Sequence, residues 1–338
     1  MRIALDAMGG DLAPREQVAG AIFAAREFGI EVALVGPPDA IAPELTKFPK
    51  TDRVSIVPAS EAITMEEDEI VKAVRSRRDA SINVAMTLVR EGRADAAVSA
   101  GNTGAVMASA FFVLGRIPGI ERPALGALLP YNAGRVFLID AGANADCRPN
   151  HLLQFAQMGS AYMERVVGVA NPRVGLLNVG EEAGKGNELA AEAHERLRES
   201  GLNFIGNVEG VNIHKGICDV VVTDGFTGNV ALKAGEGVAD YILEQVRGVI
   251  RSSPLYVSAA ILLKPALRRV LKRLQYEEYG GANLLGVNGT VVIAHGRSDA
   301  LAVKNALRLA HAAAGSGLLD TMRASFVRAE EESTAAGR

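Results

Sequence analysis

The stretch DVVVTDGFTGN, residues 219–229, joins an apolar run to a polar, glycine-containing loop, and this pattern decides the fold class. Similar runs of Val, Ile, Leu and Ala stop in loops rich in Gly, Asn, Asp or Ser at 6–11, 99–104, 140–144, 178–182, 206–210 and 295–298. Apolar runs of this kind are typical of strands buried on both faces of a parallel sheet. In open α/β sheets ligands bind beyond the carboxyl ends of the strands, so we expect these loops to share a polar crevice at one sheet edge.

Predicted strands alternate with predicted helices along most of the chain. Strand-like runs lie at 2–5, 31–36, 54–57, 95–99, 135–140, 173–178, 203–206, 218–223 and 290–294, and helical periodicity lies at 14–28, 67–76, 80–91, 103–114, 150–168, 187–200, 229–250 and 299–313. This alternation predicts an α/β fold with a mostly parallel sheet. We expect one catalytic unit over 1–328, either undivided or split into two subdomains around a central cleft, and a disordered polar tail over 329–338.

Composition excludes several classes of protein. The chain has 338 residues, 49% of them hydrophobic, and a net charge of −3, so a nucleic-acid binder is not expected. Cys147 and Cys218 lack CxxC spacing, and no set of His, Asp and Glu has the spacing of metal ligands. We therefore predict neither a disulfide framework nor a metal site. The absence of a signal peptide, and of any apolar run near the ~20 residues of a membrane span, predicts a cytoplasmic protein.

One segment, 245–276, contains no Asp or Glu but carries Arg247, Arg251, Lys264, Arg268, Arg269, Lys272 and Arg273. Pro254 and Pro265 bracket an apolar run within it, which predicts two helices that meet at an apolar tip. The tip residues are Leu255, Tyr256, Val257, Ile261, Leu262 and Leu263. One interpretation is contact with an anionic membrane surface, where each nearby cation adds ~1 kcal/mol, or with an acidic partner. The other is a helical hairpin that packs on a second copy of the chain, and both hold if the stems dimerise and the tip stays exposed.

Two loops are candidate anion sites because each joins a strand to a helix. Residues 6–11 include two glycines that let a ligand approach the backbone, but they match neither the G-x-G-x-x-G nor the P-loop pattern, and a tight turn is an equal alternative. In 100–104, Asn102 and Thr103 either cap the following helix or hold phosphate.

Two further residues carry chemistry of their own. Lys185, between Gly184 and Gly186, is interpreted as a mobile cation that meets an anion, the alternative being a solvated loop lysine. Cys147 is the thiol that follows the polar loop at 140–144. It is interpreted as a small buried residue rather than a nucleophile, because no histidine follows in a recognisable arrangement.

The loop at 223–229 and the loop at 295–298 complete the candidate site. Asn229 can donate a hydrogen bond to an oxyanion or phosphate, and Asp224 can orient a neighbour. His295 is a candidate acid, base or anion donor, or simply a hydrogen-bonded histidine.

These motifs together resemble one family, PlsX, the acyl-(acyl-carrier-protein):phosphate acyltransferases of bacterial phospholipid synthesis. The matching stretches are LDAMGGD at 5–11, SAGNTGA at 99–105, DAGAN at 140–144, KGNE at 185–188, 219–229 itself, LLGVNG at 284–289 and HGRS at 295–298. They run in order over about residues 3–315. Two places depart from the family pattern: Val211-Asn212 stands where a basic-acidic pair is usual, and Asn283 stands where proline is usual.

The resemblance implies a fold and a reaction. The fold is a three-layer α/β/α arrangement similar to phosphotransacetylases and isopropylmalate dehydrogenase, with a protruding helical hairpin. In the reversible reaction, phosphate attacks a fatty acyl thioester on acyl carrier protein and gives acyl phosphate for phosphatidic acid synthesis, without a cofactor. The family works as a homodimer on the inner face of the cell membrane, near an acyltransferase that acylates glycerol 3-phosphate.

The matched residues have implied roles. Catalysis falls to Lys185, Asn229 and His295, and contact with membrane or carrier falls to the tip residues with Arg268, Arg269, Lys272 and Arg273. Substrate and phosphate binding falls to Asp6, Gly9, Gly10, Asn102, Thr103, Gly104, Asp140, Asn144, Gly186, Asp224, Gly225 and Ser298.

Competing functions remain open. A phosphotransacetylase acting on acyl-CoA would need no apolar tip, and a decarboxylating dehydrogenase of similar architecture would need clustered Asp ligands for a metal. A non-catalytic membrane scaffold would bind acyl carrier protein without forming acyl phosphate.

Overall fold

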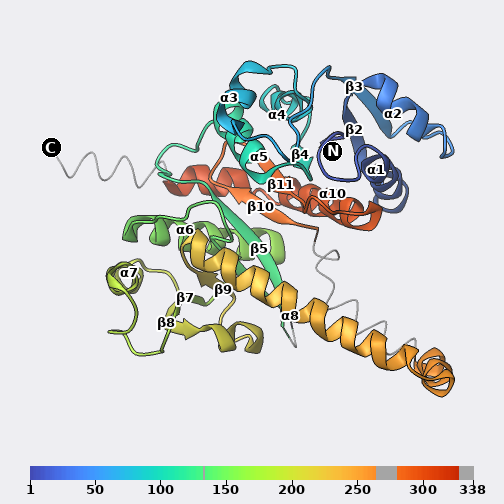
Figure 1. The fold of residues 1–338 in the computed structure, drawn as a ribbon. Helices are drawn as coiled ribbons and strands as arrows, with labels where there is room; N and C mark the ends of the chain where they lie inside the picture. Colours follow the sequence, from blue (N-terminus) through green and yellow to red (C-terminus); the bar gives the residue numbers. More distant parts are fainter. Residues whose placement is uncertain (132–133, 264–279, 327–338) are drawn as a thin grey trace.

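A computed structural model describes residues 1–131, 134–263 and 280–326 (Figure 1). The strands are β1 (Arg2–Asp6), β2 (Glu31–Gly36), β3 (Val54–Pro58), β4 (Ala96–Ser99), β5 (Ala124–Tyr131), β6 (Gly134–Ile139), β7 (Val174–Asn178), β8 (Phe204–Glu209), β9 (Val220–Val222), β10 (Ala282–Leu285) and β11 (Thr290–Ile293).

The helices are α1 (Arg15–Phe28), α2 (Pro38–Leu45), α3 (Ile70–Ser76), α4 (Ser81–Arg90), α5 (Thr103–Ser109), α6 (Pro149–Tyr162), α7 (Glu188–Glu199), α8 (Gly225–Arg251) and α10 (Ala300–Gly315). Single wider turns, η1 (Ala110–Leu114) and η2 (Met163–Val167), extend α5 and α6, and a short 3₁₀ turn, η3 (Gly210–Lys215), follows β8.

All eleven strands form one sheet in the order β3-β2-β1-β4-β11-β10-β5-β6-β9-β7-β8. The direction of the strands reverses in its middle, because β11 pairs antiparallel with β10, β10 with β5, and β5 with β6. The other pairings are parallel. We call β1–β4 with β11 the first half of the sheet and β6–β9 the second half. The predicted α/β fold with a mostly parallel sheet is confirmed.

The reversal does not carry the two sets of polar loops to opposite ends of the sheet. Ser99, the last residue of β4, lies in one row of paired residues with Ile293, Ala282, Ala127, Leu138 and Val221. The carboxyl ends of β4, β11, β6 and β9 therefore reach about the same level, and the strands of the two halves approach that level from opposite directions. The polar loops after these strands lie near the middle of the sheet rather than along one outer edge, because the antiparallel strands β5 and β10 join the two halves.

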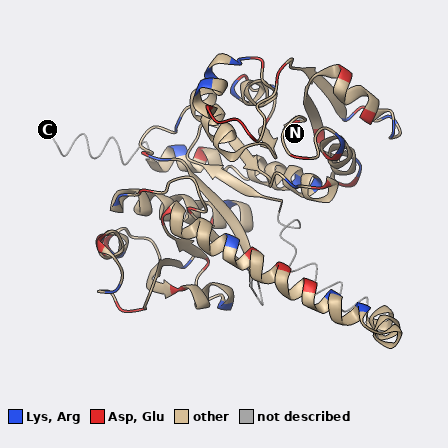
Figure 2. Cartoon of the chain, in the orientation of Figure 1, with Lys and Arg blue, Asp and Glu red and all other residues tan. Residues whose placement is uncertain are grey.

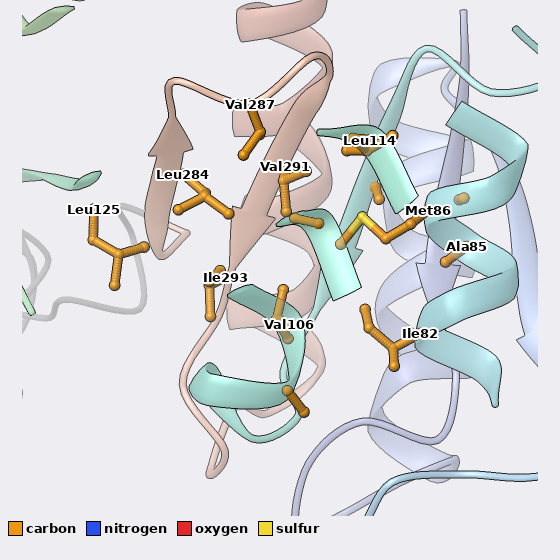
Figure 3. Close-up of a cluster of buried hydrophobic side chains, with 14 of the residues drawn as sticks. Ile82, Ala85, Met86, Val106, Leu114, Leu125, Leu284, Val287, Val291 and Ile293 are labelled. Atoms are coloured by element: carbon orange, nitrogen blue, oxygen red, sulfur yellow. The ribbon is translucent and has the colours of Figure 1, made fainter. Parts of the chain in front are cut away.

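Helices cover both faces of the sheet. On one face α4 and α5 pack on a cluster that continues across both halves, from Ala4 through Leu284 to Leu138. Figure 3 shows part of this cluster, where Met86 and Val106 lie beside Val291 and Ile293 of the sheet. On the other face α1 and α10 cover the first half, and α6 and α7 cover the second. Side chains alternate along β6, with Leu138 on the first face and Phe137 on the second, as a strand buried on both faces requires.

β5 and β10 lie at positions where the sequence predicted no strand. In β5, Gly126 leaves space that the ring of Phe137 occupies, so the strand lacks the continuous apolar run on which the prediction rested. In β10, the polar Asn283 is buried and its Nδ2 donates to the hydroxyl of Tyr162 at 3.0 Å. That hydrogen bond gives a physical role to one of the two departures from the family pattern.

α8 leaves the body of the protein as a long projection (Figure 1). It begins at Gly225, four residues before the predicted start, because Asp224 caps it by accepting from Thr227 N at 2.8 Å. A second helical segment, 254–263, begins at Pro254 at the far end of α8, and Figure 2 shows no charged residue on it. Arg268, Arg269, Lys272 and Arg273, and the tail at 329–338, lie outside the described residues. Within the described ranges, no helix combines the length and the apolar character needed to cross a bilayer.

Candidate active site

The loops after β1, β4 and β11 form one compact cluster. Asp6 is buried, and one oxygen of its carboxylate accepts from Ser99 Oγ at 2.7 Å while the other accepts from Met8 N at 3.2 Å. Burial raises the pKa of Asp6, although hydrogen bonds, including the one from Ser99, oppose the shift. Asp6 therefore acts inside the protein, where it positions the loop after β4 against the loop after β1.

Glycines make the close approach of these loops possible. A Cβ at Gly9 would come within 2.7 Å of Asp6, Ser99 and the backbone N of Gly101. Gly10 has a φ of +108° and lies against the carbonyl of Gly296, which accepts from Asp11 N at 2.9 Å. The loop after β11 is thereby joined to the same cluster.

The loop after β4 resolves one alternative for Asn102. Its Oδ1 accepts from Ala105 N at 3.2 Å, which caps α5, and its Nδ2 donates to Met65 O at 3.1 Å. The side-chain amide is therefore engaged within the protein. Thr103 is exposed, and Gly104 lies half-buried beside it, so these two residues present the open side of the loop.

A second cluster forms at the carboxyl ends of β6 and β9. Asp140 is fully buried, and its carboxylate accepts from the backbone N of Leu125, Gly142, Ala143 and Asn144 and from Asn144 Nδ2, at 2.8–3.1 Å. Burial raises the pKa of Asp140, and these donors oppose the shift. All the bonds are internal, so Asp140 fixes the shape of loop 140–144 instead of facing a ligand.

The start of α8 packs directly on this loop. Gly225 N donates to Asn144 O at 2.7 Å, and a Cβ at Gly225 would come within 2.8 Å of Asp140 Oδ2. One turn later, Asn229 is half-buried and lies over Gly142, where its Nδ2 would be 3.1 Å from an added Cβ. Asn229 thus lies at the junction of α8 and loop 140–144, in space that stays open because Gly142 has no side chain.

α8 also carries charge toward the first cluster. Glu236 is half-buried, and burial raises its pKa, while the positive charges of His295 and Lys233 oppose that shift. His295 is exposed at the end of β11, and its Nδ1 accepts from Arg297 N at 3.3 Å. Ser298, three residues after His295 in the same loop, is buried, and its N donates to His295 O at 2.9 Å. α8 therefore links the two clusters, with Asn229 near one and Glu236 near the other.

Among the described residues, no hydrogen bond joins Lys185 to either cluster. Lys185 occupies an exposed loop after β7, where its carbonyl accepts from Asn178 Nδ2 at 2.9 Å, and Gly186 turns with a φ of +97° against Asn178. Within the described residues the Lys185 ammonium forms no hydrogen bond or ion pair, and no contact joins it to Asn229 or His295. The sequence placed it among the catalytic residues, and that role stays a prediction.

The thiol of Cys147 is not suited to nucleophilic attack. Burial, followed by the charge of Asp140, raises its pKa to about 12, so the neutral thiol predominates at physiological pH. Its Sγ donates to Asn144 O at 3.5 Å. This supports the interpretation of Cys147 as a small, half-buried structural residue.

A groove of about 530 Å³ opens between α5 with η1 and loop 140–144. Met107, Ala108 and Phe111 line one side, Leu284 of β10 lines the sheet side, and Asn144 and Arg122 line the other end. We call it the α5 groove. Gly104 and Ala143 also reach it, so it touches both candidate loops. The sequence did not single out Arg122; recognising β5, which begins two residues later, would have placed it beside loop 140–144.

The chain is similar to known proteins along nearly its whole length. The family model described as "Fatty acid synthesis protein" matches residues 1–320. A phosphate acyltransferase of Heliobacterium modesticaldum is 55% identical over 312 residues, which cover 92% of this chain and 93% of that protein. One from Nostoc punctiforme is 50% identical over 334 residues, which cover 98% of each.

Among solved structures, a phosphotransacetylase from Streptococcus pyogenes superposes with a TM-score of 0.62 at 18% identity, covering 92% of this chain and 94% of that one. A branched-chain phosphotransacylase from Enterococcus faecalis superposes with a TM-score of 0.57 at 14% identity, covering 94% and 99%. At this identity the likeness concerns the fold.

Proposed function

The chain belongs to the fatty acid synthesis protein family and is an acyltransferase with phosphate as its acceptor, and from that premise we propose that its donor is a long-chain fatty acyl group on acyl carrier protein. The product is acyl phosphate, which supplies phosphatidic acid synthesis. The observation that carries the choice of a long-chain, carrier-borne donor is the exposed apolar tip at the end of α8, flanked by basic residues.

The reaction needs no covalent intermediate on the enzyme. A phosphate oxygen attacks the thioester carbonyl carbon, a C–O bond forms, the C–S bond breaks, and the thiolate of the carrier takes a proton from solvent. Phosphate is already anionic and a thiolate leaves readily, so catalysis reduces to positioning and charge stabilisation. The raised pKa of Cys147 agrees with a mechanism that does not use an enzyme thiol.

The proposed roles follow from this chemistry. Asn229, at the junction of α8 and loop 140–144, stabilises the oxyanion that forms on the thioester carbonyl. His295, at the end of β11, stabilises the same charge or the departing thiolate. Lys185 holds phosphate together with the backbone amides of Thr103 and Gly104 at the start of α5, and its long flexible stem is suited to reach an anion from a loop.

The direct test is acyl transfer from palmitoyl-acyl carrier protein to inorganic phosphate, with acyl phosphate trapped as the hydroxamate. We expect phosphate-dependent product from the wild type and a loss of at least tenfold in Lys185→Ala and in Asn229→Ala, since one donor to a developing charge contributes ~100-fold or more at a preorganised site. Lys72→Ala, an exposed lysine on α3, is the matched control and should leave the rate unchanged. Normal turnover in both site variants would refute the assigned roles.

A second candidate function is phosphotransacetylase activity on acyl-CoA, favoured by the fold of the solved structures. Acetyl-CoA as sole donor separates the two. Turnover with acetyl-CoA but none with palmitoyl-acyl carrier protein would establish this alternative. Binding of acyl carrier protein without turnover of either donor would instead establish a non-catalytic membrane scaffold.

The tip attaches the enzyme to the inner face of the membrane. Leu262 is 83% exposed, Leu255 71% and Ile261 65%, so the tip carries several exposed apolar side chains close together, and contiguous apolar patches of this kind mark interaction surfaces. Arg247 and Arg251 lie on the same helical stem and add attraction to anionic lipid or acidic carrier. Co-sedimentation with phosphatidylglycerol vesicles should fall severalfold in Leu262→Asp and should weaken with salt.

A second copy of the chain covers the apolar face of α8. Val238, Tyr241, Ile242 and Val249 are all exposed on it, with Tyr241 63% exposed. Light scattering should report a dimer for the wild type and for Leu262→Asp, and a monomer for Tyr241→Asp. The two substitutions act as controls for each other, because one leaves membrane binding and the other leaves dimerisation intact.

A further inference from the structure

The α5 groove combines an apolar wall with a cationic end. Met107, Ala108 and Phe111 follow one another along α5 and η1 with the spacing of one helix face, and Leu284 closes the side against the sheet. Phe111 is 44% exposed, although its ring packs edge-on against Phe112 at 5.3 Å. Arg116 also lines the groove, and its guanidinium carbon lies 5.8 Å from the centroid of the Phe111 ring, so the wall is an aromatic and aliphatic surface with one cation over its aromatic end.

Arg122 supplies the charge at the groove's end. Its neighbour Glu121 also lines the groove but forms no ion pair with Arg122; the Glu121 carboxylate accepts from Asn150 Nδ2 and contacts His151 Nε2, the latter at 3.0 Å. Arg122 forms no hydrogen bond or ion pair with any residue that the structure describes. A guanidinium in this state can bind an anion without first breaking an internal pair.

The backbone holds Arg122 beside the candidate site. Asn144 Nδ2 donates at 2.8 Å to the carbonyl of Pro123, the next residue, while it also donates at 2.8 Å to Asp140 Oδ2. Asp140, which shapes loop 140–144, therefore also fixes the chain at Arg122. The positive charge of Arg122 reaches into this loop, where it acts to lower the pKa of Cys147.

We propose that the α5 groove binds the acyl phosphate itself, with the fatty chain along Met107, Ala108 and Phe111 and the phosphoryl group on Arg122. Acyl phosphate has an apolar chain and an anionic head, and the groove offers an apolar wall and an unpaired cation in the same order. The volume of about 530 Å³ falls within the range of ~300–1,000 Å³ that small-ligand sites occupy. The inference rests on the proposed function, because only that reaction makes acyl phosphate.

This assignment separates two apolar surfaces. The tip beyond α8 serves the membrane, and the α5 groove serves the chain of the substrate. Ala108 is then a position that controls chain length, because a larger side chain there would fill the space that the fatty chain occupies.

Binding of alkylphosphonates by calorimetry tests the inference without requiring turnover. We expect the wild type to bind dodecylphosphonate at least tenfold more tightly than butylphosphonate, since every methylene buried against the wall adds to the affinity. Ala108→Phe should remove that preference, and Ala108→Leu should reduce it. Ala42→Phe, on an exposed position of α2, is the matched control. Arg122→Gln should weaken both phosphonates by about tenfold or more, because it removes a charge-assisted hydrogen bond to the phosphonate. Arg53→Gln at the far edge of the sheet should not.

The outcomes separate this inference from the proposed function. No binding by the wild type, an unchanged chain preference in both Ala108 variants, or unchanged affinity in Arg122→Gln would overturn the groove assignment, whatever the enzyme turns over. The expected binding pattern in a protein that forms no acyl phosphate would instead overturn the proposed function and leave the groove as an amphiphile site.

Discussion

Replacing Gly225 with Ala tests whether the contact between α8 and loop 140–144 builds the candidate site. The new Cβ would come within 2.7 Å of the backbone N and O of Asn144 and 2.8 Å of Asp140 Oδ2. These atoms would have to retreat by about 0.8 Å to reach ordinary van der Waals separation. They resist, because Asp140 and Asn144 hold each other through two hydrogen bonds of 2.8 Å.

The cost has two parts. Overpacking of a close contact costs ~1–3 kcal/mol. The retreat also stretches the 2.7 Å hydrogen bond from Gly225 N to Asn144 O, which contributes ~1 kcal/mol. We therefore expect Gly225→Ala to lower the free energy of unfolding by ~2–4 kcal/mol. Gly248, in the same helix, has no atom within 4 Å of an added Cβ, so Gly248→Ala should raise it by up to ~1 kcal/mol through helix propensity.

Urea unfolding followed by circular dichroism measures both changes, and the hydroxamate assay measures activity on the same samples. Gly225→Ala should also lose most of its activity, because Asn229 moves with α8. The reasoning is refuted if Gly225→Ala is as stable as the wild type, or if Gly248→Ala loses as much stability as Gly225→Ala does.

Substitutions at Asp140, Cys147 and Asp219 test three other features of the structure. Asp140→Asn replaces an oxygen that accepts twice from Asn144 with a donor, so we expect a loss of ~3–5 kcal/mol in urea unfolding; a loss below ~1 kcal/mol would contradict the role of this carboxylate. Cys147→Ala should keep more than half of the wild-type rate, and the thiol should react slowly with Ellman's reagent at pH 8, because its pKa is raised to about 12; abolished activity in a folded variant would revive the nucleophile. Burial opposes ionisation of Asp219, but Arg173 outweighs it and lowers the pKa of Asp219. The folded protein therefore holds the Asp219 proton more weakly than the unfolded chain does. The Arg173–Asp219 pair, in which the arginine is partly exposed, contributes ~1 kcal/mol to the free energy of unfolding. This contribution is present above about pH 4 and is lost as the pH falls further. The urea midpoint of the wild type should fall between pH 6 and pH 3 partly through loss of this pair, so the fall should be smaller in Asp219→Asn. An equal fall in the wild type and in Asp219→Asn would show that the pair contributes nothing.

Much of the fold follows from local patterns. The buried parallel strands, among them β1, β2, β7 and β9, are short apolar runs that end in polar loops, and the helices between them follow the 3.6-residue period. The sequence predicts neither β5 nor β10, because Gly126 and Asn283 interrupt their apolar runs. Both residues are explained by distant partners: Gly126 leaves space for the ring of Phe137, and Asn283 donates to the hydroxyl of Tyr162. No local signal reports a ring or a hydroxyl that arrives from a distant segment.

The candidate site divides in the same way. The loops at 6–11, 99–104, 140–144 and 223–229 are visible in the sequence, because glycines and capping residues have meanings that depend only on the neighbouring backbone. Side-chain roles within them are not visible: Asp6, Asp140 and Asn102 are polar residues in polar loops, yet their oxygens are taken by internal donors. Arg122 differs from these residues, because its guanidinium has no hydrogen-bond partner among the described residues. The carboxylate of the neighbouring Glu121 is hydrogen-bonded to Asn150 and His151 instead.

The α/β class, the family and the loops that can meet an anion are readable from the chain alone, because each of these rests on the order of residues over short stretches. Only the folded protein shows that loops from two oppositely directed halves of the sheet reach the same level, that α8 contacts both sets of loops, and that a groove lined by Arg122 touches loops 100–104 and 140–144. The physical reason is that strand direction across β5 and β10, and the partner each charged group finds, are set by contacts between segments far apart in the chain.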